Sequence, residues 1–293
     1  PLRIAINVWP GYSYAFLAQE LGYFDQNNVE VELVLRQEYS ETQDLFDDKL
    51  VDGTFQVYTD TLFNESRGIS SKVVYVTDYS TSADVVVGSF DKVSNLKGKT
   101  IGIDGINTFS HMFVLKALEK NGISENEVFF EIIPAHQILD ALIDGKIDAG
   151  HTWDPTLSQS VSAGYNIICT AGDLPGIITD TLVFHDSVIQ DRPEDIQAVV
   201  NSLNQAVSYL ENNPKDGIKI ISTSLNISED ELSNGLNGIY LLNADENLDA
   251  LTGDHETKSL LMTGKFISEY YLERGQISKI PNLDELIDAS FVK

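Results

Sequence analysis

Over roughly the first 190 residues, apolar positions follow two spacings that alternate along the chain. Short runs such as "RIAINV" and "VEVELVL" are typical of strands, whereas "YAFLAQELGYF" has the spacing of an amphipathic helix. The same alternation returns in "KTIGIDG" and "HMFVLKALEKNGI". Strands that alternate with helices form mostly parallel sheets covered on both faces. The pattern therefore predicts an α/β fold that receives ligands where loops leave the carboxyl ends of the strands.

Beyond about residue 192 the pattern becomes helical. "PEDIQAVVNSLNQAVSYLENNP" and "TKSLLMTGKFISEYYLERG" both have the apolar spacing of long amphipathic helices. Pro193 stands near the first turn of one predicted helix, and Gly275 follows the last turn of the other.

One stretch of sequence occurs twice. "LVDGTFQVYTDTL" around Asp52 is followed by "LIDGKIDAGHTWDPTL" around Asp144, so that Asp60 corresponds to Asp154 and Tyr58 roughly to Trp153. Two homologous α/β lobes, each with its strand-end loops on an equivalent edge, are the simplest explanation, and the two edges are expected to line one cleft. Chance recurrence of a common Asp-Gly turn is the alternative.

Composition narrows the class of function. Among 293 residues, 45 are acidic and 19 basic, and the net charge of −26 excludes nucleic acid and anionic membranes as partners. No apolar run approaches the roughly 20 residues that span a bilayer, and we expect any secretion signal to have been removed. Cys169 is the only cysteine, which excludes an internal disulfide and a cysteine metal cluster but permits export.

An ordered set of segments carries a family resemblance. The set consists of "WPGYSYAFLAQELGYFDQNNVEVELV", "DYSTSADVVVGS", "LKGKTIGIDG", "LIDGKIDAGHTWDPTLSQ" and "LPGIITDTLVF". Over roughly its first 210 residues the chain thus resembles the periplasmic-type solute-binding proteins of ABC importers, in the branch of nitrate, sulfonate, taurine and thiamine-precursor binders.

The resemblance implies the two-lobed type II periplasmic binding protein fold, with two hinge crossovers near residues 84–89 and 181–185. Lobe 1 would comprise residues 1–83 and 186–293, and lobe 2 residues 84–185, with closure around the ligand by hinge motion. It also implies an extracytoplasmic monomer, periplasmic or secreted, that delivers a small molecule to ABC permease subunits. A ligand-sensing domain of a membrane signalling protein is the alternative.

Two strand-end loops supply the candidate ligand contacts of lobe 1. The loop "NVWPGYS" presents an indole, a phenol and a hydroxyl, and "VYTDTL" adds polar groups before a helix. A tryptophan of the core and an aspartate N-cap are the alternatives for these two loops. The predicted contacts are Trp9, Tyr12, Ser13, Tyr58, Thr59 and Asp60.

Lobe 2 and the crossovers supply the remaining candidates. "DGINTFSHM" precedes a predicted helix whose free amides favour a polar or negative oxygen, and "HTWDPTL" projects an indole before another helix. For the polar residues of these two loops, the alternative to ligand contact is a role as helix cap. For Ser80 and Asp84, the alternative to ligand contact is a structural role at the hinge. The predicted contacts are Ser80, Asp84, Asn107, Thr108, Ser110, Trp153, Asp154 and Asp180.

Charge in these loops favours one class of ligand. The aspartates assigned to the cleft side are Asp60, Asp78, Asp84, Asp154, Asp173 and Asp180. The nearest arginine, Arg67, falls in a predicted helix. Carboxylates and aromatic faces suit a cationic or amine-bearing, possibly heterocyclic, molecule better than an anion. A polar neutral ligand suits the same loops, and an anion held by amides and hydroxyls is the alternative.

Enzymatic and metal functions are not favoured. The five histidines lie at no spacing typical of a nucleophile triad or a two-histidine metal site. The related pyrimidine synthases of thiamine biosynthesis carry a cysteine-rich run that this chain lacks. We therefore expect no catalysis, cofactor or bound metal, with a synthase-like enzyme as the third hypothesis.

Overall fold

The computed structural model describes residues 1–253 and 259–292. They form two compact units, each described here by itself. Unit 1 comprises Pro1–Tyr79, Thr179–Ser233 and Tyr240–Lys293, and unit 2 comprises Ser80–Ile178 and Asn234–Ile239.

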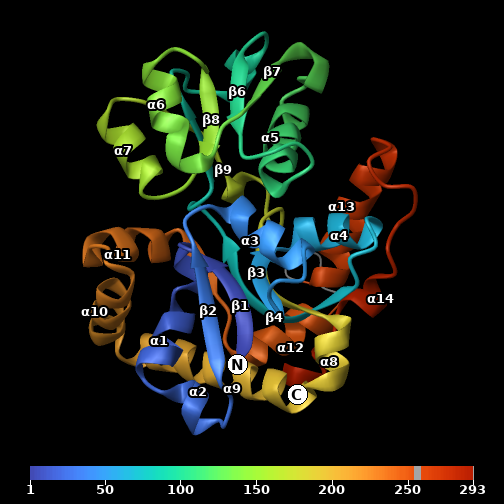
Figure 1. The fold of residues 1–293 in the computed structure, drawn as a ribbon. Helices are drawn as coiled ribbons and strands as arrows, with labels where there is room; N and C mark the ends of the chain where they lie inside the picture. Colours follow the sequence, from blue (N-terminus) through green and yellow to red (C-terminus); the bar gives the residue numbers. More distant parts are fainter. Residues whose placement is uncertain (254–258, 293) are drawn as a thin grey trace. The chain divides into compact units, whose positions relative to one another are not determined.

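Unit 1 contains a six-stranded mixed sheet in the order β11-β4-β10-β3-β1-β2 (Figure 1). β1 runs parallel to β2 and β3, whereas β10 is antiparallel to β3 and β4. The ends of β1, β3 and β4 therefore share one edge of the sheet with the beginning of β10. The strands are β1 (Leu2–Asn7), β2 (Val31–Arg36), β3 (Gly53–Val57), β4 (Ser71–Ser80), β10 (Thr179–His185) and β11 (Ile239–Leu241).

Most of the helices belong to unit 1. α1 packs against α9 and α10, and α2 against α9, as Figure 1 shows. α9 buries the apolar stripe that its sequence predicts, including Ile196, Val199 and Leu203. The helices are α1 (Tyr14–Glu20), α2 (Tyr23–Gln26), α3 (Tyr39–Asp47), α4 (Tyr58–Ser66), α8 (Asp186–Asp191), α9 (Pro193–Asn212), α10 (Pro214–Leu225), α11 (Glu229–Asn237, which continues into unit 2), α12 (Ala244–Thr252), α13 (Leu260–Glu273) and α14 (Leu283–Leu286).

Unit 2 contains a five-stranded mixed sheet in the order β7-β6-β8-β5-β9. β6 is parallel to β7 and β8, and β5 is antiparallel to β8 and β9. The elements are β5 (Val85–Gly88), β6 (Thr100–Ile103), β7 (Phe129–Ile132), β8 (Ala149–Thr152), β9 (Asn166–Thr170), α5 (Phe109–Lys120), α6 (Ile138–Ile143) and α7 (Thr156–Ser162).

Two glycines let α6 pack closely on the unit 2 sheet. A Cβ on Gly102 or Gly150 would lie 2.7 or 2.6 Å from Cδ1 of Ile138. Ile138 is fully buried in the core cluster that includes Val85 and Val87. The absence of side chains on β6 and β8 therefore makes room for the apolar face of α6.

The α/β class predicted from the sequence is confirmed. The segments predicted as extended crossovers, residues 84–89 and 181–185, have strand backbone over most of their length. The former contains β5, and the latter lies within β10, a strand of the unit 1 sheet. The chain leaves unit 1 after Tyr79 and returns at Thr179.

A C-terminal segment also belongs to unit 2, which the predicted boundaries of lobe 2 did not include. The carbonyl of Gly238 accepts the N–H groups of Thr81, Ser82 and Ala83 at 2.9 to 3.0 Å. A Cβ at Gly238 would lie 2.8 Å from the backbone nitrogen of Ala83. Because only glycine permits this approach, one position fixes Asn234–Ile239 to the beginning of unit 2.

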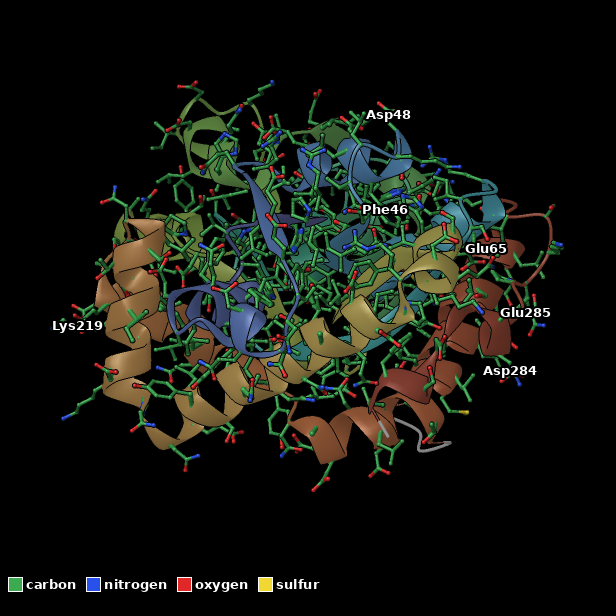
Figure 2. All side chains as sticks on the ribbon, turned by 60° about the horizontal axis from the view of Figure 1, so that its bottom comes forward. Phe46, Asp48, Glu65, Lys219, Asp284 and Glu285 are labelled. Atoms are coloured by element: carbon green, nitrogen blue, oxygen red, sulfur yellow. The ribbon has the colours of Figure 1, made fainter. Side chains whose placement is uncertain are left out.

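Acidic side chains also lie near one another around α4 of unit 1. Glu65 of α4 is partly buried, and burial together with the negative charge of Asp186 and Glu285 raises the pKa of its carboxyl. Figure 2 labels Glu65 and Glu285 on the same side of the molecule.

Candidate functional site

Three aspartates gather at the strand-end edge of unit 1. Asp78 near the end of β4 and Asp180 at the beginning of β10 are direct cross-strand partners. Asp60 lies in the first turn of α4, which follows β3 immediately. All three side chains are buried. We call Asp60, Asp78 and Asp180 the acidic edge of unit 1.

Aromatic side chains donate hydrogen bonds to these carboxylates. Nε1 of Trp9 lies 3.2 and 3.3 Å from the two carboxylate oxygens of Asp78. The hydroxyl of Tyr12 donates to Asp180, and the hydroxyl of Tyr39 donates to Asp60 at 2.8 Å. Each aspartate is thus held by a neutral donor on a ring, an arrangement that fixes its position without cancelling its charge.

The loop after β1 approaches the acidic edge closely because it contains Gly11. A Cβ at Gly11 would lie 1.8 Å from Oδ2 of Asp78 and 2.7 Å from Nε1 of Trp9. Asp78 also accepts a hydrogen bond from the hydroxyl of Thr77 at 2.8 Å. Within the "WPGYS" motif, Trp9 therefore donates the hydrogen bond, and Gly11 leaves room for the carboxylate of Asp78 that accepts it.

Three phenols at this edge have raised pKa values, mainly because they are buried. Burial, followed by the negative charge of Asp180, raises the pKa of Tyr12 well above its ordinary value. Burial and the charge of Asp60 likewise raise the pKa of Tyr39 and of Tyr271 on α13. Desolvation and negative potential act together on these phenols, which remain protonated donors at neutral pH.

The strand-end edge of unit 2 contains a buried hydrogen-bonded chain of three side chains. Nε2 of His151 on β8 lies 3.0 Å from Oδ1 of Asp84, and Nδ1 lies 2.8 Å from Oγ of Ser110. Asp84 immediately precedes β5, whose Val85 pairs with Thr152 on β8. All three side chains are buried. We call Asp84, Ser110 and His151 the buried relay of unit 2.

Aromatic rings surround the imidazole of this relay. The ring of His151 makes edge contacts with Phe109 and Phe113 of α5, at centroid distances of 5.5 and 5.2 Å. Trp153 lies 5.6 Å from His151 and 6.1 Å from Phe109 and is half-buried. The indole that follows β8 therefore rests beside the relay.

Both edges fall within one family match. The model described as "NMT1/THI5 like" matches residues 9–217, which is more than two thirds of the chain. The chain belongs to the NMT1/THI5-like family. This match confirms the branch that the sequence motifs indicated. No curated protein sequence matches the chain significantly.

Solved structures share the fold at low sequence identity. The ligand-binding component of an ABC-type import system from Staphylococcus aureus, with zinc bound, is 13% identical, with a TM-score of 0.80 and coverage of 99% of this chain and 97% of the other. The periplasmic aliphatic sulphonate binding protein SsuA from Escherichia coli is 16% identical, with a TM-score of 0.76 and coverage of 98% and 96%. The fold is that of the periplasmic binding proteins.

An enzyme uses the same fold. The desulfurization enzyme DSZB is 13% identical to this NMT1/THI5-like chain, with a TM-score of 0.72 and coverage of 99% of this chain and 97% of the enzyme. The fold alone therefore does not distinguish binding from catalysis.

Three of the predicted contacts in unit 1 lie inside the fold. The ring of Tyr58 is fully buried against α13, where a Cβ on Gly264 would lie 2.5 Å from its hydroxyl oxygen, and burial raises the pKa of Tyr58. Thr59 is also buried. The hydroxyl of Ser13 donates to the carbonyl of Pro10 at 2.6 Å, so it closes the turn before α1.

The other predicted contacts of unit 1 lie at its edge. Trp9 and Tyr12 hold the acidic edge as described, and Asp180 and Asp60 form part of it. Asp60 is the third residue of α4 and not its N-cap, because the helix begins at Tyr58. Arg67 ends α4 and pairs with Asp47 at 3.1 Å.

The polar residues predicted in unit 2 make local structural bonds. Thr108 is the N-cap of α5, and its hydroxyl donates to the carbonyl of Gly105 at 2.8 Å. The backbone N–H of Asn107, which has a positive φ of 62°, donates to Nδ1 of His111 at 3.2 Å. The hydroxyl of Ser80 accepts the N–H of Asp84 at 3.1 Å and so ties the beginning of β5.

Asp154 acts on the helix that follows it. Its Oδ1 accepts the backbone N–H of Ser158 at 2.9 Å and the hydroxyl of Ser158 at 2.5 Å. The predicted capping role of Asp154 thus has a geometric basis, although α7 itself begins at Thr156.

Sequence reasoning missed Tyr39 and His151. His151 and Trp153 are two residues apart at the end of a strand, so they project to the same face, and this signal could have linked them. Tyr39 follows the end of β2, another strand-end position where ligand contacts are expected.

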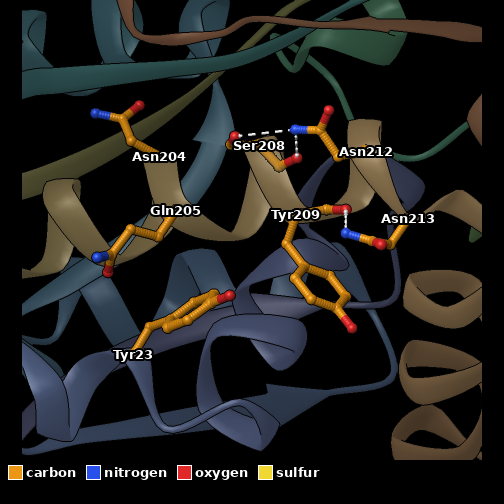
Figure 3. A pocket seen from close by; sticks show the side chains of 7 residues that line it. All are labelled: Tyr23, Asn204, Gln205, Ser208, Tyr209, Asn212 and Asn213. Atoms are coloured by element: carbon orange, nitrogen blue, oxygen red, sulfur yellow. Dashed lines mark hydrogen bonds between the residues drawn. The ribbon is translucent and has the colours of Figure 1, made fainter.

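A separate hollow of about 470 Å³ lies in unit 1 between α2 and α9. Its lining residues carry hydroxyl and amide groups, and none is a Lys, Arg, Asp or Glu. In Figure 3 Gln205 and Tyr209 lie on the side of α9 nearer the ring of Tyr23, whereas Asn204, Ser208 and Asn212 lie on its other side. The lining residues are Tyr23, Asn204, Gln205, Ser208, Tyr209, Asn212 and Asn213.

Metal-binding groups and membrane-spanning helices are both absent from the part of the chain that the structure describes. Within residues 1–253 and 259–292, no three or more His, Cys, Asp or Glu side chains come together in a group able to hold a metal ion. None of the helices in the same ranges is both long and apolar enough to span a bilayer.

Proposed function

We propose that this NMT1/THI5-like protein is the extracytoplasmic solute-binding protein of an ABC importer, and that it captures a small polar or cationic, possibly heterocyclic, solute. The fold likeness to the import component from Staphylococcus aureus and to the sulphonate binder from Escherichia coli supports the role. The strand-end edges of both units would supply contacts to the solute. Its partners would be the solute and the subunits of a membrane permease.

The acidic edge of unit 1 is the observation that carries the ligand class. Asp60, Asp78 and Asp180 are buried carboxylates, and their hydrogen bonds from Trp9, Tyr12 and Tyr39 come from uncharged groups. Burial and, after it, the neighbouring aspartates raise the pKa of Tyr12 and Tyr39, so both phenols stay protonated and donate to this edge. In a site removed from water, a cation gains far more from such carboxylates than it would at the surface.

Aromatic faces add to the case for a cation. The rings of Trp9 and Tyr12 lie 6.4 Å apart and are inclined at 58°. Indole and phenol faces attract ammonium and guanidinium groups, whereas a sulfonate requires guanidinium forks or dedicated amides. Rings beside buried carboxylates therefore favour an amine over an anion.

A thermal-shift screen with two matched panels tests the proposal. One panel contains primary amines and cationic heterocycles, and the other contains nitrate, short sulfonates and carboxylates at the same ionic strength. A compound at a hundred times its dissociation constant adds about 2.7 kcal/mol, which corresponds to a shift of several degrees for a protein of this size. We expect hits among the amines and not among the anions.

The variant Asp78→Asn keeps the shape of the acidic edge but removes one charge, and Asp230→Asn removes one charge from the exposed surface of α11. We expect the amine shift to fall in Asp78→Asn and to persist in Asp230→Asn. Stabilisation by anions alone would refute the assignment of a cation. Chemical turnover of the stabilising compound would replace the binding role with an enzymatic one.

A further inference from the structure

The buried relay of unit 2 has one consistent direction of hydrogen bonding. The carboxylate of Asp84 can only accept, so Nε2 of His151 carries the proton of their 3.0 Å hydrogen bond. In the neutral ring Nδ1 is then an acceptor, and the hydroxyl of Ser110 donates to it at 2.8 Å. Oγ of Ser110 in turn accepts the backbone N–H of Asp104 at 3.0 Å. The chain therefore runs from the backbone to Asp84.

The relay ends on an oxygen without a protein donor. Oδ1 of Asp84 is bonded to His151, but Oδ2 is buried and has no hydrogen-bond partner among the residues that the structure describes. Asp84 as a whole is only 1% exposed. Buried polar atoms are almost always satisfied, and a carboxylate oxygen left without a donor destabilises the fold. This oxygen therefore has an acceptor position that no group of the described residues fills.

The oxygen lies at the edge of unit 2 where ligands are expected. Asp84 precedes β5 at the end of the sheet where β8 finishes, since Val85 pairs with Thr152. Parallel strands of such sheets present ligand-binding loops at their carboxyl ends. Trp153 lies beside both Phe109 and the imidazole of His151, and this imidazole is bonded to the carboxylate of Asp84.

We propose that Oδ2 of Asp84 accepts a hydrogen bond from an N–H group of the solute, an ammonium or amidinium, and that His151 is the positioning residue that holds this carboxylate in place. The inference rests on the proposed function and narrows it. The predicted solute class narrows from polar or cationic molecules to cations with at least one N–H donor. Quaternary ammonium compounds are thereby excluded. A buried water molecule bound to Oδ2 is the competing explanation.

The first experiment compares methylammonium with tetramethylammonium chloride. Both ions carry one positive charge, but only methylammonium can donate. Each is titrated to about 100 mM, where the screening length in water is about 10 Å, at constant total ionic strength, and the ¹⁵N resonances of Asp84, Ser110 and the His151 ring are followed by NMR. We expect a saturable response to methylammonium and none to tetramethylammonium.

Two variants of equal charge complete this experiment. Asp84→Asn should weaken the methylammonium response about tenfold or more, as expected for the loss of a charged acceptor. Asp144→Asn removes an exposed carboxylate from unit 2 and should leave the response unchanged. Equal responses to both ions, no response to either ion, or an unchanged response in Asp84→Asn would overturn the proposal and leave water as the partner of Oδ2.

The role of His151 is tested by two replacements. His151→Gln retains an N–H donor for Asp84 and should keep most of the methylammonium response, whereas His151→Leu should lose it. If His151→Leu does not fold, the tautomer of the wild-type His151 ring, read from its ¹⁵N resonances, tests the role instead. The proposal requires a proton on Nε2 and an accepting Nδ1. Equal behaviour of the two variants, or the opposite tautomer, would contradict the positioning role.

The two proposals fail in different ways. If no compound of either thermal-shift panel stabilises the protein, the proposed function fails. If amines stabilise it while Asp84→Asn responds to methylammonium like the wild type, only the assignment of the donor to Asp84 fails.

Discussion

Replacing Gly11 by alanine should disrupt the acidic edge of unit 1 specifically. The new Cβ would lie 1.8 Å from Oδ2 and 2.3 Å from Cγ of Asp78, so the carboxylate must move. That movement breaks the bonds from Trp9 and Thr77. Overpacking costs about 1–3 kcal/mol, and the loss of a hydrogen bond to a charged group costs about 1.5–3 kcal/mol. We expect Gly11→Ala to lower the free energy of unfolding by about 3–5 kcal/mol.

Urea unfolding followed by fluorescence measures this cost in unit 1. The chain has two tryptophans, so Trp153→Phe leaves Trp9 as the reporter. Replacing Asp78 by alanine removes the carboxylate that obstructs the new Cβ. On that background the Cβ would still lie 2.7 Å from Nε1 of Trp9, so Gly11→Ala should keep part of its cost but less than in the parent, and the difference between the two costs is the coupling of a double-mutant cycle.

Two outcomes would refute this reasoning. Equal costs in both backgrounds would mean that the Cβ disturbs something other than Asp78. An unchanged midpoint of Gly11→Ala in the parent background would mean that the loop accommodates a side chain, and that the contact between "WPGYS" and the acidic edge is looser than the structure indicates.

Three further predictions concern single residues. Tyr39→Phe removes a hydroxyl that donates to Asp60 at 2.8 Å and accepts the N–H of Val57 at 3.0 Å, and it should cost about 1–3 kcal/mol in urea unfolding; no change would contradict this bridging role. Burial, with a smaller effect of nearby acidic charge, raises the pKa of the Cys169 thiol to about 12. Ellman's reagent at pH 8 should therefore label the native protein roughly a thousandfold more slowly than the unfolded chain. Labelling of the native protein at the unfolded rate would contradict this prediction. Burial lowers the pKa of His185, so the unfolded chain binds this proton more readily, and stability should fall as the pH drops from about 6.5 towards the folded-state pKa. In His185→Gln that part of the pH dependence should disappear, and an unchanged slope would assign it to other groups.

The architecture could be predicted because its signals are local. Apolar spacing distinguishes strands from helices within a few residues, and Pro193 does mark the beginning of α9. The loop after β1 could also be assigned to the strand-end edge of the sheet, because strand-end positions in α/β sheets follow from the order of elements alone.

The pairings at the two edges could not be predicted, because they join residues far apart in the sequence. Asp78 meets Asp180 only because β10 runs antiparallel to β4, and no local pattern specifies that direction. His151 meets Asp84 because β5 inserts beside β8. In the sequence, His151 is one of five histidines that lie far apart, and nothing near it indicates such a partner.

Small residues explain the placement of Tyr58 and of the C-terminal segment. Tyr58 directly follows β3, where a ligand contact was predicted, yet its ring packs against Gly264 of α13. Gly238 fixes a late segment to residues 81–83 through a single carbonyl. In both cases a distant glycine provides the space, and the sequence shows only that a glycine is present.

The most direct test of the central claim is to identify the small molecule that the protein selects. The purified protein is incubated with a small-molecule extract, washed, and denatured, and the released compounds are analysed by mass spectrometry in both polarities beside the double variant Asp78→Asn with Trp153→Ala. The account predicts an enriched compound that carries a protonated amine or amidine at neutral pH and is lost in the variant. Enrichment of sulfonates or other anions alone, or identical profiles for both proteins, would contradict it.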